Sequence, residues 1–433
     1  MVTTVIGNMF LEAYNEKFKT SFDAKTFFVE KFHKMFFDHD KHMMYVTNSP
    51  FVQKLPKEES CIMGKAEFES KEKRQERLEI LLEKIRNNEA DSSIAVGYPA
   101  SDIYRDSSSQ VPYIKRKTSE EEMFSSWIGA ALGVNVSGIT AFFFDKQLLL
   151  DIFDGWQWYR KALNDTRLLK GKQINSWNAH WLLYRYDSLD YDSEENPLDS
   201  MDCIEECEHL LRIKSIPWTF LFIRLAEHRH DEQIMAYLCR LGKMNETFGF
   251  VQFYLRQILR PVEMYKFLFG TDDVKEAENL WGTEVGFEVA CGAGVIGVKA
   301  MQPKGLEAFL LPGKENRMLN ENNKINYQTY ISFIMAMLNE KELWGKTQEM
   351  AELLHQVSVN EVGSISTKRH NLVKNLLESK TKVQFLDAVA ELSPYIKDKD
   401  VLREYVKDVT CMSKDNLALF FSLLRVQFDL VKN

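Results

Sequence analysis

Apolar residues recur at helical spacing through the last third of the chain, and this pattern constrains the fold more than any other feature of the sequence. Intervals of three and four residues place side chains on one face of a helix. Ser413 stands where an N-cap would begin the final helix. The face expected for that helix is Leu417, Phe420, Leu424 and Phe428. We therefore predict a helical bundle over residues 316–433.

Two glycine-rich segments, 127–144 and 282–313, break the helical pattern in the middle of the chain. β-Branched residues that alternate with glycine favour strands packed closely against a neighbour. Within the second segment, 287–291 and 295–296 are the strand candidates. The sequence therefore predicts a mainly α fold with a minor β component, in which a mixed α+β N-terminal region precedes the helical bundle.

The length of 433 residues exceeds what one hydrophobic core usually serves. We expect a helical N-terminal region with a long surface loop over 1–125, and a mixed α+β region with two glycine-rich strand segments over 126–315. The helical bundle at 316–433 is the third region that we expect. The 45% of hydrophobic and 27% of charged residues are typical of globular proteins, which excludes disorder along the whole chain.

One further helix is predicted before Pro261. Val251, Tyr254 and Ile258 fall on one helical face, and proline in a helix interior removes a hydrogen bond. We therefore expect this helix to be interrupted at Pro261.

Cysteine usage and hydropathy bear on the compartment. Six cysteines in 433 residues do not indicate a disulfide framework. The first 17 residues lack a signal-peptide pattern, and the chain has no run of about 18 apolar residues that could cross a bilayer. We expect a cytoplasmic protein without membrane contact.

No motif for a cofactor or a metal is complete. Residues 292–297 match G-x-G-x-x-G, but Pro303 and Gly305 leave too little room for the helix of a dinucleotide fold. Cys203, Cys207 and His209 resemble half of a zinc site, and no second tight pair follows them. We expect neither a cofactor nor a metal.

The densest cluster of titratable groups runs from Glu227 to Glu232. Such side chains can ligate a divalent metal or transfer protons. On a helix, however, His228 and His230 would point about 200° apart, so only pairs four residues apart could act together. A metal-dependent hydrolase using this cluster is one alternative, and a solvated helix end is the other.

The segment 170–186 most invites a binding function, because it mixes lysines and arginine with tryptophans and asparagines. Aromatic rings stack on bases, amides bond base edges, and cations meet phosphates. Alternatively, Trp177, Trp181 and Tyr184 form the buried face of a helix. Two other basic islands lie at 115–117 and 368–369. The candidate nucleic-acid-binding residues are Lys170, Lys172, Asn175, Trp177, Asn178, Arg185, Lys115, Arg116, Lys117, Lys368 and Arg369.

The net charge of −8 argues against a protein coated in nucleic acid, although it permits a local basic surface. The plan of a mixed N-terminal part and a helical end, without a nuclease signature, is similar to the large subunits of multi-subunit CRISPR effector complexes. That resemblance implies a non-catalytic, nucleic-acid-contacting subunit of a larger prokaryotic assembly, with a role in antiviral defence and with other protein subunits as partners. The alternative outside enzymology is a helical interaction or scaffold protein without nucleic-acid contact.

Overall fold

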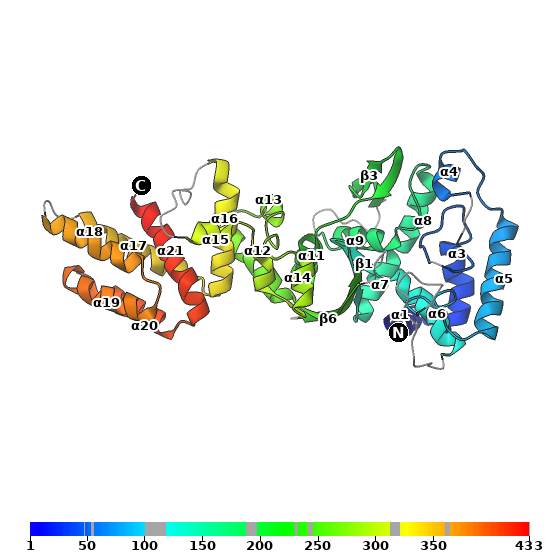
Figure 1. Cartoon of the computed structure of the whole chain (residues 1–433), viewed down its shortest axis with the longest axis horizontal. Helices are drawn as coiled ribbons and strands as arrows, with labels where there is room; N and C mark the ends of the chain where they lie inside the picture. The colour runs from blue at the N-terminus through cyan, green and yellow to red at the C-terminus, as the bar shows by residue number, and fades with distance from the viewer. Residues whose placement is uncertain are drawn as a thin grey trace. The chain divides into compact units, whose positions relative to one another are not determined.

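A computed structural model describes residues 1–46, 48–52, 56–99, 118–187, 197–229, 233–240, 246–311, 321–359 and 364–432. Over these ranges the protein is mainly helical, with one five-stranded and one two-stranded sheet (Figure 1). The predicted fold class is confirmed, because the N-terminal part is mixed and the C-terminal part is helical. No described helix is long and apolar enough to span a membrane.

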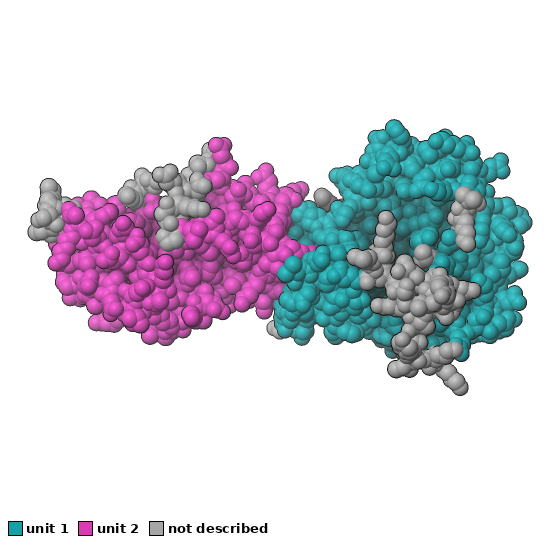
Figure 2. All heavy atoms as spheres, viewed as in Figure 1, with its two compact units in different colours: residues 1–255, 288–296 teal, residues 256–287, 297–433 magenta. Residues whose placement is uncertain are grey.

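The chain divides into two compact units (Figure 2). Unit 1 comprises Met1–Leu255 and Glu288–Ile296, and unit 2 comprises Arg256–Phe287 and Gly297–Asn433. The boundary expected near residue 125 falls inside unit 1. The division into three regions stays a prediction.

The helices that begin in the first 255 residues are α1 (Val2–Phe18), α2 (Ala24–Phe27), the π-helical η1 (Phe28–Phe32), α3 (His33–Phe36), α4 (Glu58–Ile62), α5 (Lys71–Asn87), α6 (Glu120–Ala131), α7 (Lys146–Asp154), α8 (Trp156–Asp165), α9 (Ile174–Arg185), α10 (Pro197–Ser200), α11 (Trp218–His228) and α12 (Leu255–Phe269). The strands are β1 (Val134–Val136), β2 (Ile139–Phe143), β3 (Ile204–Cys207), β4 (Leu210–Ile213), β5 (Gln233–Arg240), β6 (Glu246–Tyr254) and β7 (Val295–Ile296).

The remaining helices are α13 (Lys275–Glu278), α14 (Phe287–Gly292), η2 (Val298–Met301), α15 (Leu306–Leu310), η4 (Glu321–Asn323), α16 (Lys324–Leu338), α17 (Glu342–Val359), α18 (Ser364–Leu377), α19 (Lys382–Leu392), η5 (Ser393–Tyr395), α20 (Lys399–Cys411) and α21 (Lys414–Lys432).

Helices α1 and α6 of unit 1 cross at two glycines. A Cβ atom on Gly129 would lie 1.8 Å from the Thr3 carbonyl oxygen, and one on Gly7 would lie 2.0 Å from that of Ser125. The backbones can approach this closely only because both residues lack a side chain. The strand expected across Gly129 is wrong: α6 begins at a capping box of Ser119 with Glu122 and continues through this glycine.

The main sheet of unit 1 has the order β1-β2-β5-β6-β7 and is antiparallel except between β6 and β7. Helix α11 covers one face, where the Phe222 ring stacks on Phe253 of β6 with centroids 4.0 Å apart. The turn between β1 and β2 uses Ser137 and Gly138, whose φ angles of 50° and 77° suit a two-residue hairpin. Strand β7 confirms the candidate at 295–296.

Three local predictions in this part of the chain are wrong. Residues 287–291, expected as a strand, begin helix α14. Val251 and Tyr254, expected on a helix, lie in β6, because pairing with β5 outweighs their helical spacing. Pro261 does not interrupt the following helix, since α12 continues through it to Phe269.

The C-terminal helices of unit 2 follow the sequence pattern closely. Helix α17 packs against α18, α20 and α21. The Ser413 hydroxyl accepts a hydrogen bond from the Asn416 amide at 3.3 Å, which confirms the predicted N-cap of α21. The predicted face of this helix is buried: Leu417, Phe420, Leu424 and Phe428.

Candidate functional site

The aromatic part of segment 170–186 lies in the interior of unit 1. The Trp177 side chain is fully buried, donates from Nε1 to the Gly155 carbonyl at 2.9 Å, and stacks on Tyr159. Asn178 is also fully buried, and its Nδ2 donates to the carbonyls of Ala131 and Gly133, both at 2.8 Å. These side chains cannot reach a ligand outside the protein, so their contacts support the interpretation of α9 as a packed helix.

Arg185, expected to contact phosphate, forms an ion pair with a buried carboxylate. Its NH2 atom lies 2.8 Å from Oδ1 of Asp151, which is 4% exposed and also accepts a hydrogen bond from the Tyr186 hydroxyl. Burial and the Asp151 charge both raise the pKa of Tyr186. Arg185 therefore stabilises the charge of Asp151, and removing it would leave a carboxylate uncompensated. Asn175 is half-buried at the start of the same helix.

Lys170 and Lys172 are the members of the segment that reach the surface. Their turn is held by backbone hydrogen bonds from Lys170 to the Leu211 carbonyl at 2.9 Å and from Lys172 to the His42 carbonyl at 2.8 Å. Lys172 has a φ of 65°, which a non-glycine residue adopts rarely. The turn is thus fixed by its neighbours on both sides.

One of the two lysines, Lys172, lies beside an exposed aromatic ring. Tyr45 is 53% exposed, and the Lys172 Nζ lies 5.8 Å from its ring centroid. Nζ of Lys170 lies 3.0 Å from Glu59, and Nζ of Lys172 lies 2.5 Å from Glu58. We call Tyr45, Lys170 and Lys172 the lysine–tyrosine patch. Its positive charge is compensated by the two glutamates of α4.

A network of buried cations supports the chain segment below this patch. Arg160 of α8 donates from Nε to the Met35 carbonyl at 2.8 Å and from NH1 to the Lys41 carbonyl at 2.9 Å. In return, Nζ of Lys41 donates to the carbonyls of Thr166 and Arg167 at the end of α8. Burial lowers the pKa of Lys41 to about 8. The network therefore ties segment 35–41 to α8.

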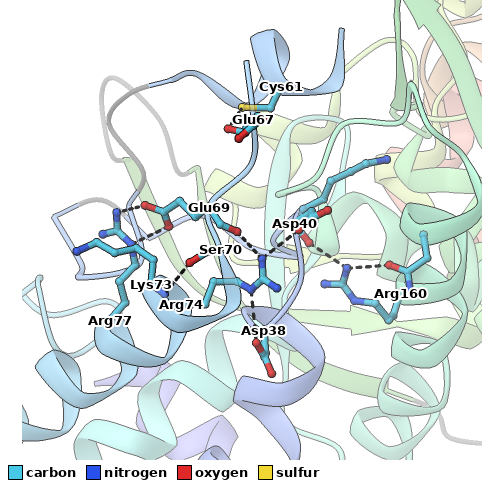
Figure 3. A network of polar contacts seen from close by, with 12 residues as sticks. Asp38, Asp40, Cys61, Glu67, Glu69, Ser70, Lys73, Arg74, Arg77 and Arg160 are labelled. Atoms are coloured by element: carbon cyan, nitrogen blue, oxygen red, sulfur yellow. Dashed lines mark hydrogen bonds and ion pairs between the residues drawn. The ribbon is translucent and has the colours of Figure 1, made fainter. Parts of the chain in front are cut away.

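Carboxylates and histidines complete the same network. Arg74 of α5 pairs with Asp40 at 3.0 Å and with Asp38 at 3.4 Å, so α5 is fixed to the same segment (Figure 3). Burial lowers the pKa of His33 to about 4 and that of His42 to about 3. Both imidazoles are neutral at pH 7 and act as packing groups.

The other basic islands lie elsewhere. Lys115, Arg116 and Lys117 fall outside the described residues. Lys368 is exposed on α18, and the guanidinium of Arg369 lies 4.8 Å from the ring centroid of Tyr395. Lys368 and Arg369 belong to unit 2, whereas the lysine–tyrosine patch belongs to unit 1.

The cluster from Glu227 to Glu232 is described only as far as Arg229. Glu227 pairs with Arg224 at 3.2 Å, and Nδ1 of His228 lies 3.2 Å from the Arg224 carbonyl oxygen. His230, Asp231 and Glu232 lie outside the described ranges. These contacts match a helix end that is satisfied by its own neighbours.

The partial zinc motif lies on a hairpin. Cys207 ends β3, and His209 lies in its turn to β4, so the two cysteines do not share a helical face. Burial raises the pKa of Cys203 to about 11, which disfavours the thiolate that a metal requires. Within the described part of the chain, no group of three or more His, Cys, Asp or Glu side chains could hold a metal ion.

Sequence reasoning missed one exposed surface, on the main sheet. Met235 of β5, Phe250 of β6 and Val295 of β7 are 47%, 58% and 50% exposed. Phe144, directly after β2, and Tyr237 of β5 both contact the Phe250 ring, with centroids 5.5 and 5.3 Å apart. We call these five residues the open sheet face.

Comparison of the chain with protein-family models, with curated proteins and with solved structures finds no match.

Proposed function

We propose that the protein is a non-catalytic subunit of a larger assembly and that it contacts nucleic acid through the lysine–tyrosine patch. The observation that carries the proposal is the position of Lys172 beside the exposed ring of Tyr45, with Lys170 two residues away in the same turn. A ring that can stack on a base, next to cations that can meet phosphates, is the combination that single-stranded nucleic acids bind.

The fixed backbone of the turn favours binding, and the neighbouring carboxylates oppose it. Hydrogen bonds to Leu211 and His42 hold the turn before any ligand arrives, so little entropy is lost there on binding. Each lysine must, however, exchange its glutamate for a phosphate. We therefore expect weak, strongly salt-dependent binding, to which other subunits of an assembly would add.

The direct test is a salt titration of binding to a single-stranded oligonucleotide. We expect Lys170→Glu with Lys172→Glu to abolish binding at low salt. Both lysines are half-buried and pair with Glu59 and Glu58, so we expect a lower melting temperature, and binding is measured well below it. Lys25→Glu is the matched control, since Lys25 is an exposed lysine of unit 1 paired with Glu120. If the parent binds neither DNA nor RNA at low salt, the proposal is wrong.

A second variant tests whether the glutamates limit binding. Glu59 holds Lys170, and the hydrogen bond from that lysine lowers the pKa of Glu59, so its carboxylate is charged at neutral pH. Glu59→Gln removes this charge, and we expect it to tighten binding by about threefold to tenfold. Glu58 is less suitable because it also accepts a hydrogen bond from the Gly171 amide. Unchanged affinity in Glu59→Gln would place the contact elsewhere.

The open sheet face favours the second candidate, a protein-interaction function without nucleic-acid contact. Exposed phenylalanine, tyrosine and methionine side chains are enriched in the centres of protein interfaces. If the parent binds no oligonucleotide, this candidate replaces the first. The hydrolase alternative stays a prediction, because His230, Asp231 and Glu232 lie outside the described residues.

A further inference from the structure

We infer that Arg160 of unit 1 binds a small monovalent anion, of the size and charge of chloride, through its NH2 group. The inference starts from a single nitrogen atom. Arg160 is 8% exposed, and its NH2 atom is buried without a hydrogen-bond acceptor among the residues that the structure describes. The inference does not rest on the proposed nucleic-acid contact, because Arg160 is buried and is not part of the lysine–tyrosine patch.

The other nitrogen atoms of this guanidinium meet only uncharged acceptors. Nε donates to the Met35 carbonyl, and NH1 donates to the Lys41 carbonyl and, at 3.5 Å, to Oδ1 of Asn164. Such oxygens satisfy N–H groups but do not neutralise a charge. A cation removed from water is unfavourable unless a negative charge accompanies it. Arg160 therefore needs both an acceptor for NH2 and a negative charge.

The carboxylates of the surrounding network do not supply that charge. Among the described residues, each of them pairs with another cation: Asp38 and Asp40 with Arg74, Glu58 with Lys172, and Glu69 with Arg77. Burial lowers the pKa of Arg160 to about 10, and the group that opposes this effect is the hydroxyl of Tyr159 rather than a carboxylate. The negative charge must then come from outside the chain.

Two further side chains favour an anion at this position. The charges of Arg160 and Arg74 both lower the pKa of His39, so both guanidinium groups lie close to its ring. Figure 3 shows the Arg160 guanidinium directed toward that of Arg74. An anion near two cations removes their mutual repulsion. His39 is half-buried, and with a pKa of about 4 it is neutral at pH 7, so its ring has one N–H to donate.

The balance of charge selects a monovalent ion. Once the pairs of Glu58 and Glu69 are set aside, three cations of the network remain against two carboxylates: Lys41, Arg74 and Arg160 against Asp38 and Asp40. One positive charge is left, which one chloride ion would neutralise. A phosphate with two negative charges would instead add a net negative charge beside the two aspartates. Because the NH2 atom is covered by protein, a small ion also fits better than a large one.

The test is the thermal stability of the full chain in chloride, with the much larger gluconate ion replacing chloride at constant ionic strength. From about 5 mM to about 300 mM chloride, we expect the melting temperature of unit 1 to rise by about 3–6 °C, because the ion binds only the folded chain. Arg160→Met should abolish this shift, since it removes both the charge and the NH2 donor. Arg77→Met is the matched control and should keep the shift, because Arg77 belongs to the same network but pairs with Glu69.

Three results of the chloride titration would overturn the inference. They are a parent that melts at the same temperature in chloride and in gluconate, a shift of equal size in Arg160→Met, and loss of the shift in Arg77→Met as well. If Arg160→Met does not fold, a crystal of the parent grown in bromide decides the question. An anomalous peak at hydrogen-bond distance from NH2 of Arg160 supports the inference, whereas a water molecule at that position contradicts it.

Discussion

Unit 1 and unit 2 bury their helices in different ways. In unit 1, α1 and α6 meet through Gly7 and Gly129, and buried polar groups such as Asn178 and Arg160 join elements that are distant in sequence. In unit 2, helices such as α20 and α21 each bury a continuous apolar stripe. Local spacing therefore specifies unit 2, whereas unit 1 depends on single long-range contacts that spacing does not reveal.

The sharpest test of this difference is a side chain at the glycine crossing. We expect Gly129→Leu to destabilise unit 1 by more than about 4 kcal/mol, because even a Cβ atom would collide with the Thr3 carbonyl. Thermal melting followed by circular dichroism should show unit 1 unfolding in a separate transition at a lower temperature than in the parent. A variant that melts with the parent would mean that α1 and α6 cross elsewhere.

A cavity in the unit 1 core should have the next largest effect. Trp177→Ala removes a fully buried ring together with its hydrogen bond to Gly155. We expect the free energy of unfolding, measured by urea denaturation, to fall by about 3–5 kcal/mol. The affinity for an oligonucleotide, corrected for the fraction of protein that is folded, should not change. Weaker binding with unchanged stability would restore Trp177 as a stacking residue.

The matching cavity in unit 2 lies on α21. Leu424 is 1% exposed, and Leu424→Ala should lower the free energy of unfolding in urea by about 2–5 kcal/mol. The exposed Val383 on α19 provides the control, since Val383→Ala should change the free energy of unfolding by less than about 0.5 kcal/mol. Equal effects of the two variants would show that the predicted stripe is not the buried one.

Acid should act mainly on unit 1. Burial lowers the pKa of His33 from about 6.5 to about 4, so between these values the unfolded chain binds a proton that the folded chain does not. The stability from this group is therefore complete above pH 6.5 and is lost as pH falls towards 4, with roughly 1–2 kcal/mol lost by pH 5. In His33→Phe the urea midpoint should therefore change less between pH 7 and pH 5 than it does in the parent.

The smallest effect has the opposite sign. Gly345 in α17 has no atom within 4 Å of a Cβ position, so Gly345→Ala should stabilise unit 2 by about 0.5–1 kcal/mol. The comparison with Gly129 is direct, because both glycines are helical and only one of them lies at a helix crossing. A destabilised Gly345→Ala would indicate that a neighbour approaches α17 at this position.

The sequence predicts the helical faces well, because an amphipathic helix carries its own signal. Ser413 and Leu417 are examples, since an N-cap and an apolar stripe are both local. The helix at Gly129 could not be predicted, because the sequence does not distinguish a glycine at a helix crossing from a glycine in a closely packed strand. The helix that begins at Phe287 was predicted as a strand for a similar reason, since so short a helix has too few residues to show a helical period.

The candidate sites were predicted less completely than the fold. The lysines at 170 and 172 are at the surface as expected, but their glutamate partners come from α4, more than 100 residues earlier in the chain. The open sheet face was missed because both alternating sets of β5 are apolar, so the strand shows no contrast between its two sides. From its sequence alone, 233–240 is typical of a strand buried on both sides. Only its position in the folded sheet shows that the side of Met235 is exposed.

The glycine crossing also has a consequence for the order of events during synthesis. Helix α1 emerges from the ribosome roughly a hundred residues before α6, which at about 5–20 residues per second is a delay of about 5–20 s. During that time the Phe10 and Tyr14 rings lack Phe153, a ring that both of them contact in the finished protein. Helix α1 thus presents apolar side chains for seconds, long enough for a chaperone to bind it and hold it until α6 has been made.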